Sequence, residues 1–180
     1  MTSEQVICTD METPIGMMIV GSTDKGCCVL EFHDRGGVEK IRLAIEKRYR
    51  KDVVAGKCSF NDMAIEQISG YFAGTRTDFD LPLDIVGTPF EKSVWQELLA
   101  TAFGKTRSYG EVAAAVSNPQ ASRAVGRANG ANRISIIVPC HRIIEANGNL
   151  RGYGGGLWRK RWLLDHEQKV LSGAAVSLFE

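Results

Sequence analysis

The spacing of apolar residues changes near residue 87, and this change limits the chain to two parts with different architectures. Before it, short apolar runs are separated by turn residues, a pattern that predicts an antiparallel meander of strands. These runs lie at residues 5–10, 16–21 and 26–32. After it, apolar residues recur mainly at helical spacing. We therefore expect one domain at 1–87, a second at 88–170 and a tail at 171–180.

The first part combines strands with helices. Two amphipathic helices, within 37–51 and 61–73, follow the three strands. Residues 78–87 alternate polar and apolar side chains around a proline, which is typical of an edge strand or an extended connector. The expected fold of this part is α/β, with an antiparallel sheet and helices.

The second part is predicted to be mostly helical. Thr88, followed by a proline, caps a first helix, and Ser108 caps a short second helix at 109–116. Asn118 is expected to cap a third helix, again with a proline in the first turn. The tight turn between the last two helices gives the proportions of a helix-turn-helix.

The last helix of this pair has one apolar and one cationic face. The apolar face carries Ala121, Ala124, Val125 and Ala128. The opposite face carries Arg123, Gly126, Arg127 and Gly130. Arginines on a face of little bulk allow a phosphate backbone to approach closely. Two packed core helices with incidental arginines are the alternative.

Charge is distributed unevenly although the net charge is only +1. Residues 88–170 carry 12 basic and 6 acidic side chains, whereas residues 1–87 carry 10 basic and 14 acidic ones. The resulting net charge of +6 on the second part favours a polyanionic partner. A solvated basic surface explains the same counts.

A cysteine–histidine pair follows an apolar run in the second part. Residues 134–138 predict a buried strand, which Pro139 ends so that Cys140 lies where the chain leaves the core. Cysteine reacts as its thiolate and needs a base or cation nearby, and His141 and Arg142 supply both. Because adjacent residues of an extended segment point to opposite faces, we expect His141 to act through a bridging water.

The other four cysteines are expected to be inert. We interpret Cys8, Cys27, Cys28 and Cys58 as free thiols of a core in a reducing compartment. A zinc site built from three of them with His33 is the alternative, but adjacent cysteines lack the usual C-x₂₋₄-C spacing. We therefore expect no metal.

The chain shows no membrane or export signal. No apolar run approaches the roughly 20 residues that cross a bilayer, and the N-terminus lacks the basic and apolar segments of a signal peptide. We expect a soluble, cytoplasmic protein that does not contact a membrane.

A glycine-rich segment, residues 151–156, precedes an expected helix at 157–168. Glycines expose their backbone amides, so this segment is a candidate ligand loop. A flexible connector is the alternative.

Several ordered motifs together match a known family. They are Ser108-Tyr109-Gly110, Ser122-Arg123-Ala124-Val125-Gly126, Ala128-Asn129-Gly130, Asn132, Ile137-Val138-Pro139-Cys140-His141-Arg142, Gly152-Tyr153 with Gly155-Gly156, Trp162-Leu163-Leu164 and His166-Glu167. The chain resembles the O6-alkylguanine-DNA alkyltransferases, strongly across 88–168 and more weakly before it. The resemblance implies an N-terminal RNase H-like α/β domain and a mostly helical C-terminal domain with a helix-turn-helix.

The resemblance also implies a reaction. Such proteins bind double-stranded DNA from the minor groove, flip an O6-alkylguanine out of the stack and move its alkyl group to a cysteine. Water does not hydrolyse the thioether formed, so each molecule reacts once. No cofactor is implied. The expected partner is double-stranded DNA containing O6-alkylguanine, bound by a monomer; O4-alkylthymine as a second lesion and cooperative binding are left open.

Catalytic roles follow from the resemblance residue by residue. Cys140 resembles the alkyl acceptor, His141 the water-mediated base and Glu167 the carboxylate that orients this base. Asn132 resembles the asparagine that braces the active-site segment, and Tyr109 the phenol that donates to the flipped guanine. The expected machinery is a Cys-His-Glu relay with two hydrogen-bonding supports.

Two sets of contact residues follow in the same way. Arg123 resembles the arginine that fills the gap left by the flipped nucleotide. The other residues expected to contact DNA are Ser122, Ala124, Gly126, Arg127 and Gly130. The expected base pocket is lined by Tyr109, Val138, Pro139, Cys140, Ile143, Tyr153 and Gly154.

Two other classes of function compete with this reading. A non-catalytic module that recognises alkylated DNA would share Arg123, but such relatives generally lack the cysteine present here as Cys140. A cysteine hydrolase would use Cys140 and His141 with sustained turnover, and it needs an oxyanion hole that the sequence does not identify.

Overall fold

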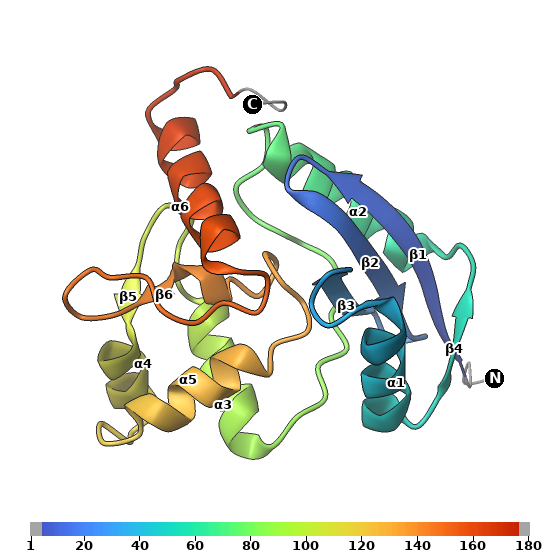
Figure 1. Ribbon diagram of the computed structural model, residues 1–180, viewed down its shortest axis with the longest axis horizontal. Coiled ribbons are helices and arrows are strands. Elements are labelled where there is room, and N and C mark those ends of the chain that lie inside the picture. Colours follow the sequence, from blue (N-terminus) through green and yellow to red (C-terminus); the bar gives the residue numbers. More distant parts are fainter. Residues whose placement is uncertain (1–4, 177–180) are drawn as a thin grey trace. The chain divides into compact units, whose positions relative to one another are not determined.

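The chain forms two compact units in the computed structural model, which describes residues 5–176 (Figure 1). The first unit covers 5–86 and the second covers 87–176. Residues 1–4 and 177–180, the latter being the end of the expected tail, lie outside the described residues. Within 5–176 no helix is both long and apolar enough to cross a membrane.

A four-stranded sheet forms the centre of the first unit. The predicted meander is confirmed, because β1 (Gln5–Thr13), β2 (Gly16–Ser22) and β3 (Cys27–Phe32) pair antiparallel in chain order. A further strand, β4 (Asp52–Ala55), was not predicted and lies parallel to β1. The sheet is therefore mixed, with the order β3-β2-β1-β4. Four residues are too short a run to show a strand period.

Two helices pack on this sheet. Ile41 and Ile45 of α1 (Val38–Tyr49) join Ile19 of β2 in one apolar cluster. The second helix, α2 (Ser59–Phe72), contacts β1, β2 and β3, and its Asn61 accepts a hydrogen bond from Ser22 Oγ at 2.7 Å. Every residue of β3 is buried, as expected for a strand that is covered on both faces.

Residues 78–87 form an extended connector, which was one of the two predictions for this segment. An isolated bridge joins Leu83 to Cys27, and the Cys27 N–H donates to Pro82 O at 2.9 Å. The pairing stops at this isolated bridge, so the segment is a connector and not a regular edge strand.

Helices build most of the second unit. They are α3 (Pro89–Leu99), α4 (Tyr109–Ala115), α5 (Ser122–Gly130) and α6 (Leu157–Leu171). Thr88 and Ser108 cap α3 and α4 as predicted, each in a capping box with the glutamate three residues later. The helix-turn-helix pair α4 and α5 packs on α3, whose Trp95 Nε1 donates to Ala128 O at 2.8 Å.

The prediction that Asn118 caps a helix is wrong. Asn118 lies in a turn, where its backbone oxygen accepts from the Ala121 N–H at 2.9 Å, and α5 begins only at Ser122. The proline after it fixes this turn rather than the first turn of the helix. α5 is thus shorter than its sequence signals suggest.

The predicted strand at 134–138 is also wrong. This segment forms turns, in which the Val138 N–H donates to Ile134 O at 3.0 Å and Ile136 has a φ of 72°. All five residues are buried. The apolar run therefore correctly indicates burial. Its length and its β-branched residues wrongly suggested a strand.

Candidate active site and nucleic-acid interface

Cys140 begins a short 3₁₀ helix, η1 (Cys140–Arg142), directly after Pro139. It is 5% exposed. Its backbone oxygen accepts from Asn129 Nδ2 of α5 at 3.2 Å and from the Ile143 N–H. The backbone is held on both sides, so the thiol has a defined position just below the surface. The extended geometry expected for Cys140 and His141 is wrong, because this segment is helical.

Asn132 braces the segment that leads to Cys140, as the resemblance implied. It is 3% exposed, its Nδ2 donates to Val138 O at 2.8 Å, and its Oδ1 accepts from the Ile134 N–H at 2.9 Å. One side chain thereby replaces the backbone partners that a strand would have supplied.

His141 and Glu167 form a fully buried pair. His141 Nε2 lies 2.6 Å from Glu167 Oε1, which comes from α6, and both side chains have no exposed surface. The Gly104 N–H also donates to Glu167 Oε2, at 2.9 Å. Burial alone would raise the pKa of Glu167, but His141 and Arg142 lower it to about 2. The carboxylate is therefore ionised at neutral pH.

The ionised carboxylate fixes the protonation of the histidine. Burial lowers the pKa of His141, so its ring is neutral at neutral pH. Since Glu167 only accepts hydrogen bonds, Nε2 must carry the proton and donate it. His141 Nδ1 is then the nitrogen with a free lone pair, and it is buried with no hydrogen-bond partner among the described residues. This nitrogen can accept a proton.

Arg142 has a different role from the one that its sequence position suggested. Its guanidinium donates to both oxygens of Glu167, from Nε at 3.0 Å and from Nη2 at 3.0 Å, and Nη1 donates to Thr101 O at 2.7 Å. It also lies over the Phe103 ring, 5.5 Å from the centroid. Arg142 thus holds the Glu167 carboxylate.

Tyr109 is the first residue of α4 and lies beside the segment that follows η1. β5 (Arg107–Ser108) pairs in parallel with β6 (Ile143–Ile144), which brings the start of α4 next to Ile143. Tyr109 is partly buried, and its hydroxyl donates to Arg151 O at 2.8 Å. Burial raises the pKa of its phenol, so it keeps its proton at neutral pH. Tyr109 is thus a hydrogen-bond donor at the expected pocket.

The residues expected to line the base pocket differ in burial. Val138, Pro139, Cys140 and Ile143 are buried, Tyr109 and Tyr153 are partly buried, and Gly154 is exposed. The buried members cluster around η1, whereas Tyr153 and Gly154 belong to the loop before α6. The expected pocket thus combines buried residues around η1 with a more exposed loop before α6.

Lys160 was not predicted to have a role. It has no exposed surface, and its ammonium donates to backbone oxygens of Ile143, Arg151 and Gly152. From the sequence it was one of three consecutive basic residues. Its spacing of three and seven residues from Leu163 and Glu167, both buried, was the signal that could have placed it on the inner face of α6.

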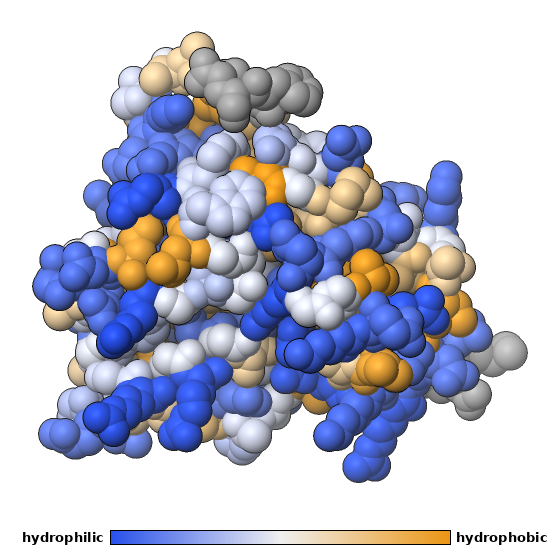
Figure 2. Space-filling view, viewed as in Figure 1, coloured by the Kyte–Doolittle hydropathy of each residue, from blue (hydrophilic) through white to orange (hydrophobic). Residues whose placement is uncertain are grey.

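α5 presents the exposed face that its sequence predicted. Val125 and Ala128 are buried, and Arg123, Arg127 and Gly130 are exposed. A Cβ added to Gly130 would meet no atom within 4 Å, so the face is open there. The other expected DNA contacts, Ser122, Ala124 and Gly126, are partly buried. The surface over α4 and α5 is mainly hydrophilic (Figure 2).

The alternative of a zinc site finds no support in the described residues. Within 5–176 no three Cys, His, Asp or Glu side chains form a group that could hold a metal ion. Burial raises the pKa of Cys8 and of Cys27 to about 12, which keeps both as thiols. His33 Nε2 instead lies 2.8 Å from Asp10 Oδ1.

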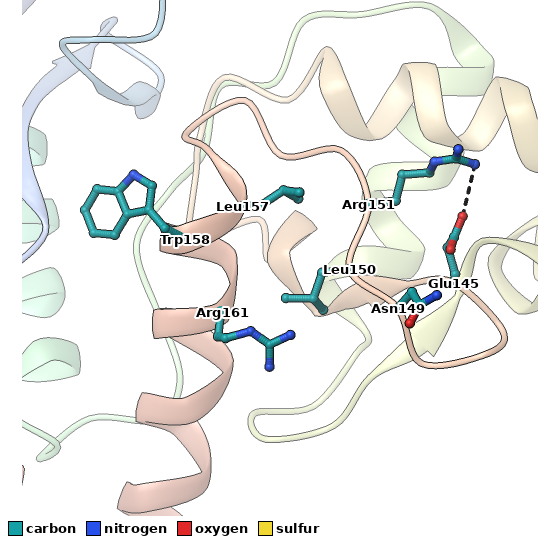
Figure 3. A pocket seen from close by; sticks show the side chains of 7 residues that line it. All are labelled: Glu145, Asn149, Leu150, Arg151, Leu157, Trp158 and Arg161. Atoms are coloured by element: carbon teal, nitrogen blue, oxygen red, sulfur yellow. Dashed lines mark ion pairs between the residues drawn. The ribbon is translucent and has the colours of Figure 1, made fainter.

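A surface depression of about 480 Å³ includes Arg151, the residue whose backbone oxygen accepts from Tyr109 (Figure 3). It is lined by Glu145, Asn149, Leu150, Arg151, Leu157, Trp158 and Arg161. Arg151 and Glu145 form an ion pair at 3.0 Å, and the Trp158 ring points away from them. The lining holds no nucleophile, so the depression does not explain the chemistry of Cys140.

Two sequence models of known domains match almost the whole chain. The ribonuclease-like domain of 6-O-methylguanine DNA methyltransferase matches residues 6–85, and the DNA-binding domain of the same proteins matches residues 89–169. The chain belongs to the 6-O-methylguanine DNA methyltransferase family. This confirms the family resemblance, the ribonuclease-like α/β fold of the first unit and the helical DNA-binding fold of the second.

Individual 6-O-methylguanine DNA methyltransferases are similar over most of the chain. The methylated-DNA–protein-cysteine methyltransferase of Mycobacterium leprae is 43% identical over 177 residues, 96% of this chain and 98% of that protein. The crystal structure of Mycobacterium tuberculosis O6-methylguanine methyltransferase has a TM-score of 0.78 at 41% identity and covers 91% of this chain and 93% of its own. Mycobacterium tuberculosis OGT in complex with DNA has a TM-score of 0.77 at 39% identity, with coverages of 92% and 94%. The chain is therefore an enzyme of a DNA-binding family in which a cysteine accepts the methyl group.

Proposed function

We propose that this protein repairs DNA directly, by moving an alkyl group from O6 of guanine to Sγ of its own Cys140. The observation that carries the proposal is the buried His141–Glu167 pair beside Cys140, which leaves His141 Nδ1 as an unprotonated acceptor. A thiol needs such a base because it is mostly protonated at neutral pH.

The reaction follows from these groups. The proton of Cys140 passes to His141 Nδ1 through a bridging water, and the thiolate attacks the saturated carbon on O6. The S–C bond forms as the C–O bond breaks, and the electron pair stays on the guanine, to which Tyr109 donates a hydrogen bond as its hydroxyl leaves Arg151 O. The guanine anion is then neutralised by a proton from water. The thioether is inert to water, so each molecule reacts once and needs no cofactor.

Access to the base requires DNA bound at α5. The exposed Arg123 and Arg127 and the open surface at Gly130 support a close approach of the minor groove. We infer that the guanine is flipped into the pocket beside η1, because Cys140 is 5% exposed and cannot reach a stacked base. Arg123 then fills the gap in the stack. A monomer has every residue that this scheme uses.

Mass spectrometry tests the proposal directly. The protein is incubated with excess duplex carrying one O6-methylguanine, and one added methyl group, confined to the Cys140 peptide, is the expected result. Cys140→Ser serves as the control and should bind the duplex without gaining mass. Binding of damaged DNA without transfer would favour a recognition module, and continued release of product would favour a hydrolase. A second duplex with O4-methylthymine tests the other candidate lesion.

A further inference from the structure

Asn129 of α5 carries a buried oxygen that has no hydrogen-bond partner in the part of the chain that the structure describes. The side chain is 6% exposed, and the unpartnered atom is its Oδ1. Its Nδ2 donates to Cys140 O at 3.2 Å. Because a carbonyl oxygen only accepts hydrogen bonds, this contact fixes which end of the amide is the nitrogen. The unpartnered atom is therefore an acceptor and not a donor.

The Asn129 side chain contacts two residues of the expected base pocket. One is Cys140, through the hydrogen bond to its backbone oxygen. The other is Tyr109: burial raises the pKa of its phenol, and a hydrogen bond with the Asn129 side chain opposes this shift. Since Oδ1 has no partner among the described residues, Nδ2 makes this contact as well. Oδ1 is bonded to the same carbon as Nδ2, so the unpartnered acceptor also lies beside these two pocket residues.

The backbone acceptors next to Asn129 already have hydrogen bonds. Cys140 O accepts from Asn129 Nδ2 and from the Ile143 N–H, which together use both of its lone pairs. Ile143 O accepts from Lys160 Nζ. Of these three oxygens, Asn129 Oδ1 is the one whose hydrogen-bonding capacity is unused. A donor on a ligand in the pocket would therefore be bound best by Oδ1.

O6-alkylguanine has a single group that can donate to this acceptor. Alkylation of O6 leaves N1 without a proton, and N9 carries the sugar, so the 2-amino group is the only N–H donor of the base. O4-alkylthymine has no N–H donor, because its N3 has no proton and its N1 carries the sugar. A site with a buried acceptor binds poorly any ligand that leaves this acceptor unpaired.

We propose that Asn129 determines the specificity of the pocket for guanine: its Oδ1 accepts a hydrogen bond from the 2-amino group of the flipped O6-alkylguanine. The inference rests on the proposed function and names the group by which the site recognises its substrate. Nδ2 of the same amide holds the backbone of Cys140. One side chain thus positions the base and the attacking residue relative to each other.

The test compares duplexes that differ only in the modified base. They carry O6-methylguanine, O6-methylhypoxanthine, which lacks the 2-amino group, or O4-methylthymine. Single-turnover rates are measured for the wild type, for Asn129→Leu and for Gln96→Leu. Leucine has nearly the shape of asparagine and no hydrogen-bonding groups, and Gln96 is an exposed amide on α3. The unfolding midpoint and the affinity for undamaged duplex are measured for each variant.

The wild type should react about tenfold or more faster with O6-methylguanine than with O6-methylhypoxanthine, because the analogue leaves Oδ1 unpaired. Asn129→Leu should reduce this ratio to within about twofold of one, and should reduce the preference over O4-methylthymine by a similar factor. Losing the contact with Cys140 O would slow all three substrates alike. The ratio therefore separates recognition of the base from positioning of the cysteine. Gln96→Leu should keep the wild-type ratios.

Two results would overturn the inference: wild-type rates on O6-methylguanine and O6-methylhypoxanthine that agree within about twofold, or a wild-type ratio in Asn129→Leu. The first needs no variant, so misfolding cannot obscure it. Absence of any methyl on wild-type Cys140 would instead reject the proposed function.

Discussion

Glu167 shows how one carboxylate sets the chemistry of a site without touching the reacting atoms. Its two oxygens accept from His141, Arg142 and the Gly104 N–H. Arg142 compensates its charge, so His141 can stay neutral and still donate through Nε2. Because Nε2 carries the proton, Nδ1 keeps a free lone pair. Removing the charge of Glu167 should therefore change the tautomer of His141.

Glu167→Gln is expected to slow alkyl transfer by about 10²- to 10⁴-fold, as in other relays whose histidine adopts the wrong tautomer. The amide nitrogen of glutamine donates, so His141 Nε2 would accept and the proton would move to Nδ1. Single-turnover transfer from O6-methylguanine duplex measures the effect. Asp165→Asn, an exposed change of the same type on α6, is the control. A wild-type rate in Glu167→Gln would mean that Nδ1 is not the base.

The same pair predicts how stability depends on pH. The pKa of Glu167 is about 2 in the folded protein, against about 4.3 when unfolded. Its stabilisation is therefore complete above about pH 5 and is lost as the pH falls towards 2. The lowered pKa of His141 acts in the same direction, since the unfolded chain binds its proton below about pH 6.5. Urea unfolding at several pH values should show wild-type stability falling with acid more steeply than that of Glu167→Gln. Parallel curves would contradict this.

Among the helices, α3 and α4 begin with the same kind of cap, but only the cap of α4 lies next to a residue of the site. Thr88 Oγ1 accepts from the Glu91 N–H at 3.2 Å, and Ser108 Oγ accepts from the Glu111 N–H at 3.1 Å. Tyr109 follows Ser108 directly and is the first residue of α4. The cap of α4 therefore also orients a residue of the site.

Ser108→Ala and Thr88→Ala should each lower the free energy of unfolding by about 1 kcal/mol, because each removes one capping hydrogen bond. Only Ser108→Ala should also slow transfer, by a few fold, since Tyr109 loses its fixed backbone. Denaturant unfolding and single-turnover kinetics on both variants provide the comparison. Equal effects on transfer would show that α4 does not need its cap to position Tyr109.

Short sequence patterns correctly predicted the features that depend only on neighbouring residues. The caps at Thr88 and Ser108 are of this kind, as is the Cys140–His141 pair. The strand predicted at 134–138 was wrong because the side chain of Asn132, and not a neighbouring strand, forms hydrogen bonds with the backbone there. The spacing of apolar residues does not reveal such a contact.

Short sequence patterns could not predict contacts between residues that lie far apart in the sequence. Arg142 and Glu167 are 25 residues apart, and Lys160 meets acceptors on three segments. Glu167 was predicted only through the family resemblance, and Lys160 not at all. Both lie on the buried face of α6, where a charged residue in an apolar position was the available signal.

For the whole molecule, the division of charge along the chain determines how DNA binding responds to salt. Residues 88–170 carry a net charge of +6 and include the α5 face, whereas residues 1–87 carry a net charge of −4. Each basic side chain that neutralises a phosphate displaces counterions, which makes the affinity fall as salt rises. The salt dependence should therefore come from the second unit alone.

Arg127→Ala should reduce the slope of log affinity against log salt by about 1, since it removes one phosphate contact. The loss of affinity should be the same for damaged and undamaged duplex, because a backbone contact does not read the base. Lys57→Ala, an exposed change in the acidic first unit, should leave the slope unchanged. Fluorescence anisotropy between 50 and 200 mM salt, a range over which the Debye length falls about twofold, measures both slopes. If Lys57→Ala lowered the slope as much as Arg127→Ala, DNA would contact the first unit as well, and the α5 face would not account for the binding.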